Sequence, residues 1–123
     1  MLSEPSNSLA TDWPWPDSLD AMLAAPGYHT VLLENDRVRV VETRIRRGGI
    51  VPVHTHRWPS VATILSWSHF VRRDPDGKVT LDTRQLAELP KPNSPFWQEP
   101  LVPHTVENVG DTEFVAVQVE IKK

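Results

Sequence analysis

Two histidines, His54 and His56, stand two residues apart in the run PVHTHRWPS (52–60). The run is typical of extended chain, in which alternate side chains share a face, so both imidazoles fall on one face about 6–7 Å apart. Two rings at that separation can bind one ion about 2.0–2.1 Å from each ring nitrogen. A third ligand must come from elsewhere, and His104 in VPHTVEN is the candidate because it opens another predicted strand. The alternative is that these histidines only form hydrogen bonds or face solvent.

The composition excludes several other kinds of chemistry. The chain has no cysteine, which excludes thiol nucleophiles and thiolate metal sites, so any metal ligand must be His, Asp or Glu. A net charge of -3 gives no basic field, so neither nucleic acid nor a membrane surface is an expected partner. No nucleophile-elbow or phosphate-loop motif is present. The expected partner is therefore a small molecule.

The sequence also predicts where the protein works. The first residues lack the cationic and apolar regions of a secretory signal, and no apolar run is long enough to span a bilayer. We therefore expect a cytoplasmic protein.

A group of arginines offers a second candidate for chemistry. Such a group could recognise a carboxylate or a phosphate through guanidinium forks. The interpretation we favour is a solvated outer strand face, paired with the nearby acids Glu34, Asp36 and Glu42. The arginines are Arg37, Arg39, Arg44, Arg46 and Arg47, joined by Arg72 and Arg73.

The sequence divides into two parts: residues 1–27 form an N-terminal arm and a short helix, and residues 28–123 form a β-barrel domain. At 123 residues the chain has room for one domain. Residues 1 to about 16 form a loose arm whose Trp13 and Trp15 are expected to dock on the barrel or on a second subunit. The run PDSLDAMLAAPG (16–27) predicts one short helix with Asp17 or Ser18 as N-cap.

Residues 28–123 carry the signals of an all-β domain. Asp76 and Gly77 predict a hairpin turn, and five prolines between residues 86 and 103 predict an irregular or edge segment. Many short strands with frequent turns favour a sandwich or barrel. Besides the strand that His104 opens, the predicted strands are 29–33, 37–45, 52–56, 60–67, 69–73, 78–82 and 112–121.

Strand parity predicts a pocket around the paired histidines. Ser60, with Ala62 and Ile64, falls on the same face as His54 and His56. Trp58 falls there too, although Pro59 beside it could turn the ring outward.

The remaining histidines and aromatic residues have weaker assignments. His69 could line the pocket as an extra ligand or acid–base group, but a surface or core histidine is the favoured interpretation. Trp67, Phe96 and Trp97 are expected in the core. His29 has no companion in the sequence, and we assign it no role.

Two runs resemble the paired motifs of the cupin superfamily. In GGIVPVHTHRWPS, Gly48 lies six residues before His54, and in EPLVPHTVEN, Pro103 precedes His104 with Asn108 four positions later. The resemblance covers residues 30 to 121 and is greatest to small single-domain bacterial cupins. It implies a small jelly-roll β-barrel that holds a metal with His54, His56 and His104.

The sequence departs from the family pattern at three places. Ser60 stands where the family usually has a glutamate ligand, and Ser66 to Ser68 occupy the region of an expected glycine. The second motif lacks its glycine between proline and histidine. These losses leave the fold intact but remove one of the family's usual metal ligands.

A three-histidine site would favour an anionic substrate, because neutral ligands leave the ion its full charge. The ion would be iron, nickel, zinc, manganese or copper. The resemblance implies a dioxygenase- or isomerase-like enzyme acting on a small polar or anionic metabolite. The alternative is a non-catalytic small-molecule binding or sensing cupin, which need not hold a metal. Exposed barrel edges and the arm predict a homodimer.

Overall fold

The computed structural model describes residues 13–122, which fold as a barrel preceded by a short helical segment. The segment consists of the 3-10 turn η1 (Asp17–Leu19) and the single-turn helix α2 (Ala21–Ala24). No helix in this part of the chain is long and apolar enough to cross a membrane. The strands are β1 (His29–Glu34), β2 (Val38–Ile45), β3 (Ile50–His54), β4 (Ser60–Ser66), β5 (Phe70–Arg73), β6 (Val79–Asp82), β7 (Phe96–Gln98), β8 (His104–Asn108) and β9 (Phe114–Ile121).

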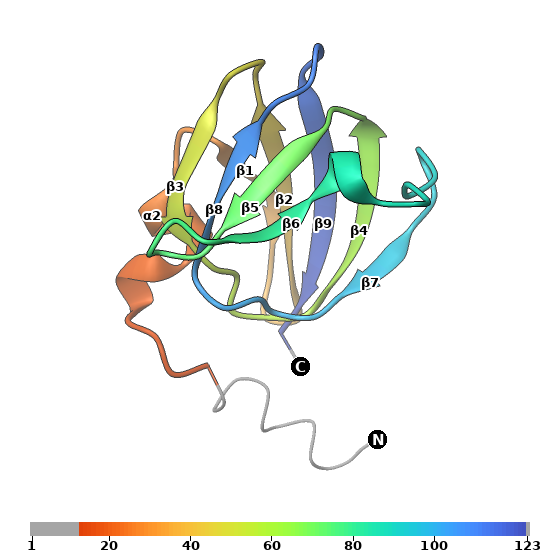
Figure 1. Ribbon diagram of the computed structural model, residues 1–123. Coiled ribbons are helices and arrows are strands. Elements are labelled where there is room, and N and C mark those ends of the chain that lie inside the picture. Colours follow the sequence, from red (N-terminus) through yellow and green to blue (C-terminus); the bar gives the residue numbers. More distant parts are fainter. Residues whose placement is uncertain (1–12, 123) are drawn as a thin grey trace.

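The strands form two antiparallel sheets that face each other (Figure 1). One sheet has the order β1-β2-β9-β4-β7 and the other has the order β3-β8-β5-β6. The longest pairing joins β2 to β9, from Val38 opposite Ile121 to Ile45 opposite Phe114. This arrangement confirms the all-β jelly-roll barrel predicted from the sequence.

The turn predictions also hold. Asp74 and Lys78 close the β5–β6 hairpin, where Gly77 has a φ of 90°. Between residues 86 and 103 the described chain forms only the three-residue strand β7, which lies at the edge of its sheet.

The core lies between the sheets, where the alternating side chains of the strands point inward. Phe96 and Trp67 pack against this core as expected. The same expectation for Trp97 is wrong, because its side chain alternates with those of its neighbours along β7 and is 54% exposed. Its indole Nε1 instead donates to Glu99.

The helical segment differs from the prediction, because it is interrupted at Asp20. Asp20 has extended backbone angles, φ −60° and ψ 135°, between η1 and α2. The predicted N-cap residues, Asp17 and Ser18, lie inside η1, and neither helical element has a side-chain cap.

The interruption arises because Asp20 forms a bridge with Thr55, the residue between His54 and His56. The Ala21 amide donates to the Thr55 carbonyl at 2.9 Å, and the Thr55 amide donates to the Leu19 carbonyl at 2.8 Å. The segment therefore fixes the backbone between the two histidines.

The arm also contacts the barrel. Trp13 is buried, and the Arg57 guanidinium lies 4.5 Å from its ring centroid. This agrees with the expectation that the arm docks on the barrel. Residues 1–12 of the predicted arm lie outside the described residues.

A buried ion network joins the same segment to the barrel wall. Arg39 on β2 binds the Asp20 carboxylate at 2.9 and 3.0 Å, and its Nε donates to Glu120 on β9 at 2.7 Å. Glu120 has no exposed surface. The expected solvated face therefore describes Arg44, which pairs with Glu42 at 3.0 Å, but it is wrong for Arg39.

The substitution Glu120→Gln tests this network, because it removes the charge while nearly keeping the side-chain volume. Arg39 stays buried and keeps Asp20 as its one counter-charge, so we expect the free energy of unfolding to fall by about 1.5–3 kcal/mol, as for a lost hydrogen bond to a charged group. The matched control, Glu113→Gln, removes a half-exposed partner of Arg44 and should cost less than about 1 kcal/mol. Denaturant unfolding of metal-free protein measures both, and equal losses would contradict the buried network.

Candidate functional site

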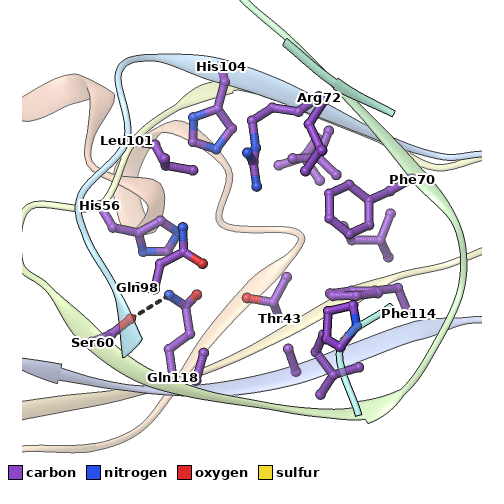
Figure 2. Close-up of a pocket in the computed structure, with 18 of the residues that line it drawn as sticks. Thr43, His56, Ser60, Phe70, Arg72, Gln98, Leu101, His104, Phe114 and Gln118 are labelled. Carbon is purple, nitrogen blue, oxygen red and sulfur yellow. Dashed lines mark hydrogen bonds between the residues drawn. The ribbon is translucent and has the colours of Figure 1, made fainter. Parts of the chain in front are cut away.

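A cavity of about 250 Å³ lies inside the barrel, between the two sheets (Figure 2). Every strand contributes to its lining. Most of the wall is apolar, from side chains such as Ile45, Val51, Phe70 and Phe114. The polar side chains include four histidines.

The four histidines come from both sheets, and the rings of the other three surround the ring of His54. His29, at the start of β1, lies 5.0 Å from His54, and His56, just after β3, lies 5.5 Å from it, between ring centroids. His104, the first residue of β8, pairs directly with His54 across the sheet, with ring centroids 4.6 Å apart. His54 therefore has all three other rings as neighbours.

Three of these imidazoles are close enough to share one ion. The potential ligand atoms of His29, His54 and His56 all lie within 4.8 Å of one another. His104 adjoins this group through His54. The expectation that His29 has no companion is therefore wrong, because its ring is also 5.3 Å from that of His56.

Each of the four rings is held through its Nδ1 atom. His29, His54 and His104 contact backbone carbonyls of Ala25, Pro52 and Val102 at 3.0, 2.8 and 2.7 Å. Carbonyl oxygens can only accept, so Nδ1 must carry the proton and donate. The lone pair of each neutral ring is then on Nε2, as metal-ligating histidines require.

His56 is held in the same way by a carboxylate instead of a carbonyl. Its Nδ1 lies 2.7 Å from Oε2 of Glu120, whose other oxygen accepts from Arg39. A carboxylate behind a histidine orients the ring and increases its basicity as a ligand. The buried ion network described above therefore ends at a candidate ligand.

Burial keeps three of the rings neutral. Desolvation lowers the pKa of His54 to about 2, and it lowers the pKa of both His29 and His104 to about 4. The neighbouring imidazoles contribute in the same direction at all three. Neutral imidazole is the form that binds metal, so these rings need not lose a proton first.

The position of the missing family glutamate is filled differently. Ser60 is buried and its Oγ accepts from Gln118 Nε2 at 3.0 Å (Figure 2). Glu120 lies opposite Ser60 in the β4–β9 pairing, but its carboxylate reaches the outer side of His56. The close group of candidate ligands is therefore made of imidazoles alone.

The other predicted pocket residues have mixed outcomes. Ser60 and Trp58 both line the cavity. The Trp58 ring also lies 5.0 Å from the Arg39 guanidinium and 5.3 Å from Lys122 Nζ. His69 is not among the residues that line the cavity, and its Nδ1 pairs with Thr83 Oγ1 at 2.9 Å. This contact fits the favoured interpretation of a structural histidine.

Sequence reasoning missed two side chains of the site. His29 follows no motif, and only the pairing of β1 with β2 brings it to the cavity. Arg72 also lines the cavity, although it was grouped with the arginines of a solvated face. Strand parity was the available signal. Phe70 and Arg72 are two residues apart on β5, so they must share a face, whereas Arg73 falls on the opposite one.

No protein-family model matches this chain, and no curated protein matches it.

Solved structures do resemble it. A cupin domain from Bordetella pertussis Tohama I is 32% identical, with a TM-score of 0.61, over 77% of this chain and 92% of that one. An RmlC-like cupin family protein from Methanocaldococcus jannaschii is 13% identical, with a TM-score of 0.54, over 76% of this chain and 77% of that one.

A third similar structure is the polyketide cyclase RemF from Streptomyces resistomycificus, with 19% identity and a TM-score of 0.50. The likeness covers 77% of this chain and 64% of that one. The two more distant structures show a shared fold. The Bordetella domain shares sequence as well, over nearly its whole length, and the chain therefore belongs to the cupin superfamily.

Proposed function

We propose that this protein is a metal-dependent enzyme that acts on a small polar or anionic molecule inside the barrel. The observation that supports the proposal is the set of four inward imidazoles, each held by Nδ1 with its Nε2 free. In this proposal His29, His54 and His56 hold the ion, and His104 completes the site beside His54. The cavity next to them receives the substrate.

The donor set fits a divalent transition metal. Imidazole suits iron, nickel, copper and zinc, and manganese is less favoured by nitrogen ligands. When bound, such an ion would supply Lewis-acid chemistry or, as iron, oxygen chemistry. The chain itself orients the ligand rings through Ala25, Pro52, Val102 and Glu120 and surrounds the substrate with an apolar wall that excludes water.

The reaction type is proposed as dioxygenase- or isomerase-like. The fold supports enzymes, since the similar RemF structure is that of a polyketide cyclase, although fold alone does not determine function. The second candidate is a non-catalytic binding or sensing cupin. It is favoured by the absence of a carboxylate from the close ligand group of the described residues.

Metal binding is the first test. We expect wild-type protein, stripped and reloaded, to bind one divalent transition-metal ion per chain by elemental analysis. His54→Ala should weaken binding most, because His54 adjoins the other three rings. His29→Ala should reduce metal affinity by more than the roughly 10–100-fold expected when only a hydrogen-bond partner of a ligand is lost. Calorimetric titration measures these losses.

Two further variants complete this test. His104→Ala should weaken binding less than His54→Ala, and His69→Ala, outside the cavity lining, should bind as the wild type does. A wild type that stays metal-free after exposure to iron, nickel, zinc, manganese and copper would end the metal proposal.

Oxygen consumption tests the dioxygenase form of the proposal. We expect iron-loaded wild type to take up oxygen with at least one member of a panel of diketones, thiols and catechols, because the ion and the cavity adjoin. His54→Ala should not. Metal-loaded protein that binds panel members without changing them, by oxygen electrode and mass spectrometry, would instead favour the binding cupin.

A homodimer through β1 is also proposed. This edge strand pairs only with β2 among the described strands and exposes Val31, Leu32 and Leu33, which is an aggregation risk unless covered. We expect a dimer by light scattering at micromolar concentration and a monomer for Leu32→Lys. Leu65→Lys, the same change at an exposed leucine of β4, away from the β1 edge, is the control, and a monomeric wild type would contradict the proposal. The cytoplasmic location stays a prediction.

A further inference from the structure

Arg72 is a cation placed inside an apolar cavity. It lies on β5, and Figure 2 shows its guanidinium pointing into the open centre of the pocket, between His104 and Phe70. Within residues 13–122 its side chain has no hydrogen bond or ion pair, and its Nε atom is buried without a partner. The guanidinium carbon lies 5.8 Å from the centroid of the Phe70 ring.

Other arginines near the barrel interior have partners. Arg39 binds Asp20 and Glu120, and Arg73, the next residue on β5, pairs with Glu107 at 2.8 Å. Burial lowers the pKa of Arg72, and no carboxylate of the described chain opposes that effect. An arginine nevertheless keeps its charge. Arg72 is half-buried, and a partly desolvated charge without a partner is costly, so its retention calls for an explanation.

Two more buried polar atoms lack a partner among the described residues, and both belong to residues that line the same cavity. They are Thr43 Oγ1 and Trp67 Nε1. Thr43 is on β2, in the sheet opposite Arg72, and Figure 2 shows its side chain at the far wall of the opening. A hydroxyl and an indole N–H can both donate. The cavity wall therefore contains polar groups and one positive charge for which residues 13–122 supply no partner.

The size and apolar lining of the cavity limit which ligands could bind these polar groups. Between Arg72 and Thr43 the lining is mainly apolar, with Phe70, Phe114 and Ile64. At about 250 Å³ the cavity is slightly below the roughly 300–1,000 Å³ typical of pockets for drug-sized ligands. A bare inorganic anion would leave the apolar surface uncovered. A small organic acid would use both the charge and the walls.

We infer that Arg72 binds the carboxylate of a small organic acid whose apolar body fills the cavity and whose reactive end lies at the histidines. This inference deepens the proposed function by naming a substrate class. The part that places the reactive end rests on that proposal. The part that assigns the carboxylate to Arg72 does not, because it concerns a cation on a different strand.

Matched acids and amides test the inference. Benzoate, phenylacetate and 4-methylpentanoate are titrated at up to millimolar concentration against their uncharged amides, using metal-free protein so that the carboxylate cannot bind an ion. We expect acids to bind wild type, and Arg72→Met to lose about ten- to hundredfold in affinity for them, as for a charged hydrogen bond. Affinity for the amides should stay within about threefold, because the apolar contacts that dominate their binding remain.

Two matched variants and one anion complete the titration. Arg73→Met, whose guanidinium pairs with Glu107, should bind the acids as wild type does. Arg72→Lys should be intermediate, because it keeps the charge without the bidentate fork. Inorganic phosphate should bind more weakly than the acids. The inference is overturned if no acid binds, if acids and amides lose affinity together, or if phosphate binds as well as the acids.

Thermal unfolding separates binding from a structural role. Ligand-free Arg72→Met should unfold at or above the wild-type temperature, because an unpaired and partly desolvated charge is replaced by an apolar side chain. A fall larger than that of Arg73→Met would assign Arg72 to the stability of the barrel and overturn the inference. Zinc-loaded protein in the same titrations keeps the two proposals apart. If no metal binds, only the metal proposal fails, and if metal binds but acids ignore Arg72, only this inference fails.

Discussion

A carboxylate with no exposed surface, that of Glu120, connects three parts of the molecule. It accepts from Arg39 on the neighbouring strand, and through Arg39 it is linked to Asp20 in the helical segment. Its other oxygen holds His56. A buried charge needs such partners, because desolvation would otherwise force it to neutralise. The orientation of one candidate ligand thus depends on interactions that extend to the neighbouring strand β2 and the N-terminal segment.

The sequence predicted those features that depend on periodicity and turn chemistry. The strand predicted over residues 112–121 is β9, Phe114–Ile121, and Asp76-Gly77 forms the expected hairpin. Parity placed Ser60 beside the paired histidines, and the structure agrees. The resemblance to cupins is confirmed by the shared sequence of a solved cupin domain. Short-range patterns are reliable where a strand keeps its two-residue period against a buried face, as β2 does.

The features that escaped prediction depend on contacts between distant residues. The helix interruption at Asp20 arises from its pairing with Thr55 and its ion pair with Arg39, and local propensity contains neither. His29 meets His54 only after β1 joins the edge of its sheet. Trp97 was expected inside because tryptophan usually buries, but β7 is too short and too peripheral to cover both of its faces.

The bridge between the helical segment and the barrel also bears on how the chain should be divided. The segment holds the Thr55 backbone through residues 19 and 21, and the Ala25 carbonyl holds His29. The boundary between residues 27 and 28 divides the sequence into two parts. Hydrogen bonds nevertheless join these parts at the Thr55 backbone and at the His29 ring. The helical segment and the barrel should unfold as one cooperative unit. A protein shortened to residues 28–123 would lose the hydrogen bonds by which the segment positions Thr55 and His29.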